Sequence, residues 1–191
     1  MIYFTSDLHF NHDQPFIYEA RGYNNVEEMN LAQIWRFNRT VQPNDECWIL
    51  GDLIMGELAE GKRYLRELQG KIHVVIENHD SAKRVSFYQD LGWDCHPAAY
   101  WKYNKYQFYL SHFPAYCYNL YDGDKGLKNI LINLHGHTHS VEKFFAGLYP
   151  MYHVGIDAHR YPISIEQIIT DIKEAYYGSN LFLHGDSSNC H

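Results

Sequence analysis

Short apolar runs alternate with amphipathic segments along most of the chain, a pattern typical of an α/β protein. The runs are rich in Ile, Val, Phe and Tyr, which favour strands, and most of them are bounded by polar or glycine-containing turns. We expect strands over residues 2–5, 47–50, 72–76, 98–103, 106–110, 130–134 and 152–156.

Apolar residues recur at helical spacing in four other segments, which predicts helices over residues 25–41, 58–69, 81–91 and 164–178. Asn25, Ser81 and Ser164 stand at positions where their side chains can cap the first turn of these helices. In the first helix, one stripe is expected to pack on a sheet: Leu31, Ile34, Trp35, Asn38 and Val41. We expect a single domain over residues 1–178 and a loosely ordered tail over residues 179–191.

Composition excludes several classes of protein. The net charge of −7 and the lack of a basic block disfavour duplex nucleic acid as a partner, although bound cations would offset part of that charge. The four cysteines are scattered without a C-x-x-C pair, which disfavours a zinc finger or a disulfide framework and indicates a reducing compartment. With no signal-like start and no apolar run long enough to cross a bilayer, we expect a cytoplasmic protein without a membrane partner. The oligomeric state stays open.

Potential metal ligands follow five of the apolar runs. Ligands of α/β proteins bind at the carboxyl ends of strands, where residues on neighbouring strands, about 4.8 Å apart, can converge. In extended backbone, Asp7 and His9 would also point to the same side. The strand-end residues are Asp7, His9, Asp52, Asn78, His79, His112, His137 and His139.

The densest cluster is the stretch 134–139, which holds three histidines in five residues. A packed core offers few partners for so many ring nitrogens, whereas a divalent metal accepts neutral imidazole readily. Gly136 is expected to let the chain turn tightly, so that His137 and His139 aim at one place. His12, in the loop after the first strand, is either a substrate contact or a surface residue.

Without His79, seven candidate ligands remain, three with oxygen donors and four imidazoles. They exceed the three or four that one catalytic zinc takes, so we expect two metal ions. A carboxylate can bridge two cations about 3.5–4 Å apart, the spacing of two-metal hydrolytic sites. Mixed nitrogen and oxygen ligands favour manganese, iron, zinc or nickel over magnesium or calcium. Among these, manganese is the ion that we expect.

In their order along the chain, these motifs resemble those of the calcineurin-like metallophosphoesterase superfamily. The resemblance covers residues 7–139, and the segment from Val154 to the last helix is similar to the end of its small members. It implies an α/β protein with a four-layer α/β/β/α sandwich of two mixed β-sheets. It also implies that the protein is a dinuclear metal-dependent phosphoric ester hydrolase.

The resemblance further assigns a role to each motif residue. One metal would be held by Asp7, His9 and His139, and the other by Asn78, His112 and His137. Asp52 would bridge the two. A metal-bound hydroxide would attack the phosphorus while His79 protonates the leaving oxygen, and Asn78 and His79, together with His12, would contact the substrate.

One position departs from the superfamily pattern, because Glu77 stands where glycine usually precedes Asn-His. A glutamate there adds negative charge and disfavours a positive φ, so it either points away, displaces its neighbours or repels a phosphate.

We therefore expect a phosphoesterase for a small phosphodiester or phosphomonoester, with nucleotides among the candidates. The aromatic segment 113–128 is the candidate for substrate selection, either by stacking on a base or by ordinary packing. The alternatives are a catalytically weak or inactive metal-binding protein on the same fold, similar to the retromer scaffold subunit, and a metal-sequestering or sensing protein.

Overall fold

The computed structural model describes residues 1–117, 130–145 and 149–183. Ten strands form two five-stranded sheets within these ranges, and the order of strands is β10-β1-β2-β3-β4 in the first sheet and β5-β6-β7-β9-β8 in the second. Strands β1 to β4 run parallel and β10 pairs with β1 antiparallel. In the second sheet, β6, β7 and β9 are parallel while β5 and β8 are antiparallel at the edges. The predicted α/β fold with two mixed sheets is confirmed.

The first sheet consists of β1 (Ile2–Thr5), β2 (Glu46–Leu50), β3 (Lys71–Val75), β4 (Asp94–His96) and β10 (Ile163–Ser164). The second consists of β5 (Ala99–Tyr103), β6 (Tyr106–Leu110), β7 (Leu131–His135), β8 (Phe144–Phe145) and β9 (Met151–His153). The helices are α1 (Pro15–Tyr18), α2 (Val26–Thr40), α3 (Leu58–Leu65), α4 (Ala82–Asp90), α5 (Ile156–His159) and α6 (Ile165–Leu183).

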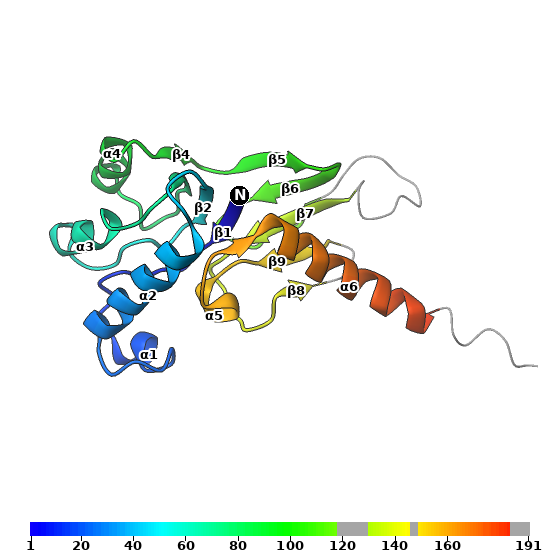
Figure 1. The fold of residues 1–191 in the computed structure, drawn as a ribbon, viewed down its shortest axis with the longest axis horizontal. Coiled ribbons are helices and arrows are strands. Elements are labelled where there is room, and N and C mark those ends of the chain that lie inside the picture. Colours follow the sequence, from blue (N-terminus) through cyan, green and yellow to red (C-terminus); the bar gives the residue numbers. More distant parts are fainter. Residues whose placement is uncertain (118–129, 146–148, 184–191) are drawn as a thin grey trace, which may run out of the picture.

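Two apolar clusters hold these elements together. In β2, Cys47 and Ile49 point toward α2, α3 and α4, whereas Trp48 and Leu50 point toward the second sheet, as the period of two in a strand requires. The cluster that contains Trp48 and Leu50 joins both sheets to the isoleucine face of α6. Figure 1 shows α2, α3 and α4 on one side of the molecule and the second sheet with α6 on the other.

Helix α2 begins as predicted, because the side chain of its N-cap residue Asn25 accepts a hydrogen bond from the backbone of Glu28. Its predicted core face is partly right, because Val41 is fully buried and Ile34 packs against the same apolar cluster, but other positions differ. Leu31 and Trp35 are 56% and 60% exposed, and the residues that the helix buries are Met29, Asn30, Gln33 and Phe37. Because two of these buried residues, Asn30 and Gln33, are polar, the spacing of apolar residues alone does not identify the buried face.

Three element ends also differ from the sequence prediction by more than one residue, and the first of them is that of helix α3, which ends at Leu65 instead of at residue 69. The predicted strand over residues 152–156 ends at His153, and a short helix begins at Ile156. Helix α6 starts after the capping residue Ser164 but continues through Gly178 to Leu183, so the first five residues of the predicted tail are helical. A single glycine costs a helix only about 1 kcal/mol.

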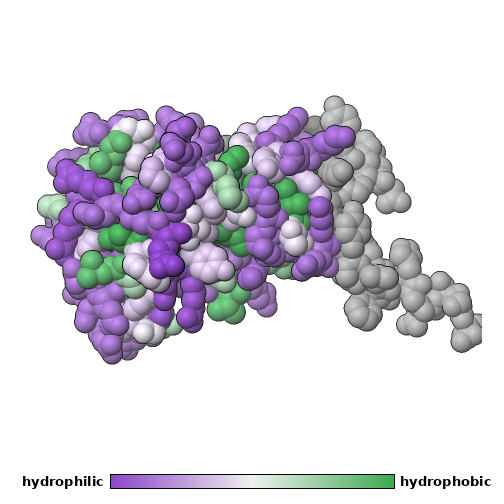
Figure 2. All heavy atoms as spheres, in the orientation of Figure 1, coloured by the Kyte–Doolittle hydropathy of each residue, from purple (hydrophilic) through white to green (hydrophobic). Residues whose placement is uncertain are grey.

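On the face of the molecule in Figure 2, hydrophilic residues predominate and apolar ones are scattered between them. Among the described residues, no helix has the length and apolar character needed to span a membrane.

Candidate metal centre

The carboxyl ends of β1, β2, β6 and β7 meet at one edge of the paired sheets, and backbone hydrogen bonds join their loops. The amide of His9 donates to the carbonyl of Asp52 over 2.8 Å, and the amide of Gly136 donates to that of His112 over 3.0 Å. A third bond crosses between the sheets, from the amide of His137 to Asp7 Oδ1 over 2.9 Å. The loops that carry the predicted ligands therefore form one connected unit.

Six of the seven predicted ligands converge in this unit. The first ligand group consists of Asp7, His9, Asp52 and His139, and the second ligand group consists of Asp52, His112 and His137. Within each group, the candidate ligand atoms lie within 4.8 Å of one another. The seventh residue, Asn78, is exposed in the turn after β3. Asp52 belongs to both groups.

Asp52 lies between the two groups. Its Oδ2 is 3.4 Å from His9 Nε2 and 3.6 Å from His112 Nε2, and its Oδ1 is buried without a hydrogen-bond partner. Burial raises the pKa of this carboxyl group, and the neighbouring His112 offsets only part of that effect. A buried carboxylate oxygen without a partner costs free energy unless a cation satisfies it.

The two imidazoles of the first ligand group face each other. Nε2 of His9 and Nε2 of His139 are 3.1 Å apart, close to the separation of two ligands on one transition metal. Nδ1 of His139 lies 2.7 Å from Asp157 Oδ2, so donation of its proton there leaves Nε2 free to coordinate. The same hydrogen bond, which the Asp157 carboxylate accepts, raises the pKa of His139.

Burial and hydrogen bonds set the charge of His9 and Asp7 and the orientation of His112. Burial lowers the pKa of His9 to about 3, so this imidazole is neutral at physiological pH. Nδ1 of His112 lies 2.8 Å from the carbonyl oxygen of Leu50, which directs the opposite nitrogen toward Asp52. Burial alone raises the pKa of Asp7, but His153, the Ser6 hydroxyl and the nearby imidazoles outweigh it and hold that pKa below its usual range.

The backbone carries strain at the same positions. Asp7, His9, Asp52, His137 and His139 all have a positive φ, between 50° and 69°. The expectation that extended backbone brings Asp7 and His9 to one side is therefore wrong; two left-handed residues do so instead. Such conformations cost about 1–3 kcal/mol each and cluster at functional sites, where the surrounding structure enforces them.

Two glycines allow the ligand loops to approach each other. Gly51 has a φ of +84°, and a Cβ at this position would lie 2.3 Å from His112 Nδ1. A Cβ on Gly136 would lie 2.4 Å from the hydroxyl of Ser6 and 2.7 Å from Asp7 Oδ2. Gly136 is needed for this close approach, whereas the sequence suggested a need for a tight turn.

Glu77 turns toward the residue that is expected to be catalytic. Its Oε2 accepts a hydrogen bond from the backbone amide of His79 over 2.5 Å, and its own amide donates to Asp80 Oδ2 over 3.2 Å. Glu77 keeps a negative φ, and the two ligand groups converge with this residue in place. The glutamate therefore folds into the turn that carries Asn78 and His79.

Taken together, these side chains fit divalent transition metal ions. The donors are imidazoles and carboxylates, several are fixed by hydrogen bonds from behind, and Asp52 has an unsatisfied oxygen where two cations could share it. The geometry supports divalent metal binding at this edge.

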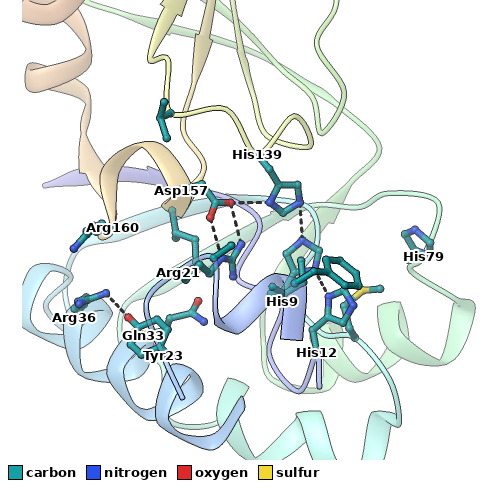
Figure 3. A pocket seen from close by; sticks show the side chains of 16 residues that line it. His9, His12, Arg21, Tyr23, Gln33, Arg36, His79, His139, Asp157 and Arg160 are labelled. Atoms are coloured by element: carbon teal, nitrogen blue, oxygen red, sulfur yellow. Dashed lines mark hydrogen bonds and ion pairs between the residues drawn. The ribbon is translucent and has the colours of Figure 1, made fainter. Parts of the chain in front are cut away.

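A cavity of about 680 Å³ opens beside the first ligand group. Figure 3 shows His9 and His139 pointing toward each other in it, with His12 beside His9 and His79 set further along the wall. Apolar side chains of Phe16, Ile17, Met55 and Val141 form part of the lining, and basic residues form another part. The volume is within the usual range of small-molecule sites.

Sequence reasoning missed two residues of the site. Arg21 forms a paired interaction with Asp157, with Nε and Nη2 at 2.9 and 3.0 Å from its two oxygens, and it also donates to the backbone oxygen of Asp7 over 2.9 Å. Asp157 in turn orients His139. Neither residue follows a strand that carries a ligand, and the superfamily motif around residues 154–157 was the only signal that pointed to Asp157.

No family model matches the sequence. An uncharacterized protein of Methanocaldococcus jannaschii is 34% identical over 142 residues, which cover 73% of this chain and 69% of that protein. A solved structure from Aquifex aeolicus, described as a protein of unknown function, aligns over 90% of this chain and 99% of its own with a TM-score of 0.67 and 22% identity. A structure described as a novel archaeal phosphodiesterase aligns over 81% and 82% of the two chains with a TM-score of 0.42 and 15% identity.

The chain belongs to one family with the Methanocaldococcus protein. Its two mixed sheets and the convergence of the motif residues at one sheet edge agree with the resemblance to the calcineurin-like metallophosphoesterases that the sequence motifs carry.

Proposed function

We propose that the protein is a dinuclear metal-dependent phosphoesterase that hydrolyses a small phosphodiester or phosphomonoester. The observation that carries the proposal is the position of Asp52, with one oxygen between His9 and His112 and the other buried without a partner. A carboxylate so placed is suited to bridge two cations. Manganese is the ion proposed, with iron, zinc or nickel as the other candidates.

The two ligand groups suggest how the metals would be shared. Asp7, His9 and His139 would hold one ion, and His112 and His137 would hold the other together with the amide oxygen of Asn78, which follows β3 at the same edge. Asp52 would complete both. When bound, the metal pair would supply an activated water and would neutralise charge on the phosphoryl oxygens.

His79 is the proposed general acid. Its ring lines the cavity beside the first ligand group, and its backbone amide is fixed by the carboxylate of Glu77. It would donate a proton to the leaving oxygen, a contribution of about 10²–10⁴ in rate for a positioned acid. Its exposure allows the ring to exchange that proton with solvent between turnovers.

The cavity suits a phosphorylated organic molecule of nucleotide size. Phe16 and Val141 are exposed and can contact an apolar or planar group, while Arg36 and Arg160 offer positive charge farther from the metals. His12 lies 3.3 Å from His9, ring nitrogen to ring nitrogen, and is proposed as a substrate contact. On the other side, Phe113 packs edge-on against His112 and His137. Most of the segment expected to select substrate, including Tyr118 and Tyr121, lies outside the described residues.

The test is hydrolysis of bis-p-nitrophenyl phosphate and p-nitrophenyl phosphate by metal-stripped protein, before and after addition of Mn²⁺. We expect release of p-nitrophenol only with metal, and a loss of about 10²–10⁴ in kcat for His79→Ala. Lys83→Ala, in the exposed part of helix α4, is the matched control and should retain the rate. The ratio of the two rates ranks diester against monoester.

Metal binding without turnover of either compound would favour the second candidate, a metal-binding or scaffold protein on the same fold. The argument for that candidate rests on Glu77 alone, the position that departs from the superfamily pattern. The carboxylate of Glu77 is occupied by the amide of His79, which weakens the argument that it repels a phosphate.

A further inference from the structure

A third group of potential ligands lies at the far edge of the first sheet and shares no residue with the two groups above. It consists of His73 on β3 and of Asp94 and His96 on β4, and its ligand atoms lie within 4.8 Å of one another. His73 pairs with Asp94 in the parallel register of the two strands, and His96 is two residues farther along. All three side chains therefore stand on one face of the sheet.

Neighbouring contacts hold the two imidazoles in place. The indole of Trp48 on β2 stacks on His73 with a centroid separation of 4.7 Å and lies 5.5 Å from the ring of His96. Trp48 is itself 8% exposed and belongs to the core between the sheets. The rings of His73 and His96 thus rest on a rigid apolar wall, which limits the entropy lost when they coordinate an ion.

Within the protein, Asp94 is the ion-pair partner of one of the two imidazoles. His73 Nδ1 is 3.2 Å from Asp94 Oδ2, so these two form a pair. Within the part of the chain that the structure describes, the ring nitrogens of the partly buried His96 have no hydrogen-bond partner. An ion pair between His73 and Asp94 explains two members of the group but not the third.

Two imidazoles and one carboxylate form a ligand set that zinc takes in proteins, with water in the fourth position. The carboxylate side chain of Asp94 is 69% exposed, so solvent can reach that position. Ligand atoms around a tetrahedral zinc ion are about 3.3 Å apart, so a bound ion would draw these three together from within their present 4.8 Å.

We propose that His73, Asp94 and His96 bind a divalent transition metal ion of the zinc class, separate from the dinuclear centre. The ion would tie β4, a three-residue edge strand, to its neighbour β3. The second sheet begins at Ala99, three residues after His96, so the same ion would also fix the connection between the two sheets.

The test counts zinc ions on the metal-stripped full chain, titrated with Zn²⁺ and freed of excess, in wild type and in His96→Gln and Asp94→Asn. We expect each variant to bind one equivalent fewer than wild type, with at least a hundredfold loss of affinity at this site. Asp90→Asn, an exposed carboxylate on α4, is the control and should bind as wild type does.

A second readout is the thermal midpoint, because an ion that binds only the folded state raises it. Excess Zn²⁺ should raise the midpoint more in wild type and Asp90→Asn than in the two variants. If His96→Gln fails to fold, Asp94→Asn still decides, since its side chain is exposed and not part of the core.

Equal zinc stoichiometry in wild type and both variants would overturn the proposal. The readout is the difference of one equivalent and not the total. Absence of the dinuclear centre would therefore leave one ion in wild type and none in the variants, so a failure of the proposed function is distinguishable from a failure of this inference.

Discussion

Replacing Asp157 with asparagine tests whether the hydrogen bond behind His139 prepares it to bind metal. The carboxylate accepts hydrogen bonds from His139 Nδ1 and Arg21 Nη2 at Oδ2 and from Arg21 Nε at Oδ1. An asparagine oxygen in the place of Oδ2 can keep one bond to each neighbour, but its amide nitrogen then faces Arg21 Nε donor to donor, and the negative charge beside His139 is lost. Loss of such an outer partner lowers metal affinity by about 10- to 100-fold.

The same change should destabilise the metal-free protein. The side chains of Arg21 and Asp157 are only 8% and 14% exposed, and removal of one partner from a buried ion pair costs about 3–5 kcal/mol. Arg21 retains its hydrogen bonds to the backbone oxygens of Asp7 and Leu8. We therefore expect a smaller loss, of about 2–3 kcal/mol.

Two measurements on Asp157→Asn check these values: titration with Mn²⁺ and urea denaturation in the presence of a chelator. Asp90→Asn is the control for removal of a carboxylate and should change neither. Mn²⁺ affinity within twofold of wild type would refute the orienting role of Asp157. Unchanged stability would show that the hydrogen bonds of Arg21 to the backbone oxygens of Asp7 and Leu8 fully compensate for the lost pair with Asp157.

Three further predictions concern the ligand loops. Gly51→Ala should lose metal binding at the second ligand group and at least about 2 kcal/mol of stability in chelator, because its Cβ would clash with His112. The control is Gly92→Ala, which also has a positive φ (+80°) but has open space around its Cβ, so it should show only the left-handed cost of about 1–2 kcal/mol. Equal losses of stability in the two variants would contradict the argument. Glu77→Gln should keep the hydrogen bond to the backbone amide of His79 and retain kcat within about threefold in the Mn²⁺ assay. Glu77→Gly removes that bond and should lower kcat about tenfold. A glycine variant faster than wild type would instead mean that Glu77 hinders turnover. Burial raises the folded-state pKa of Asp52 above its unfolded value, so ionisation of Asp52 opposes folding as pH rises above about 4. The thermal midpoint of metal-free Asp52→Asn should therefore exceed that of wild type by a margin that grows from about pH 4 to about pH 7. A margin that shrinks over this range would mean that the pKa of Asp52 is lowered by folding.

The convergence of the candidate ligands could be predicted from the sequence because these residues stand at strand ends. Asp7, Asp52, His112 and His137 each follow an apolar run, and parallel strands bring such ends to one edge of a sheet. The strands over residues 2–5 and 106–110 have the predicted bounds, since both are apolar enough to be recognised without tertiary information.

Other features depend on long-range packing and could not be predicted. Asn30 and Gln33 are buried in α2, so its core face differs from the apolar stripe. The left-handed backbone at His9 and His139 is enforced by the surrounding loops, since neither residue favours it. The pairing of Arg21 with Asp157 joins residues 136 positions apart and leaves no trace in local spacing.

The central claim is that two metal ions act together in phosphoester hydrolysis. The most direct test is the rate of bis-p-nitrophenyl phosphate hydrolysis as Mn²⁺ is added in measured equivalents to metal-stripped His96→Gln protein, in which the proposed third site is removed. We predict almost no turnover with one bound ion and full activity with two. Full activity with one ion, or none at any metal content, would contradict the claim.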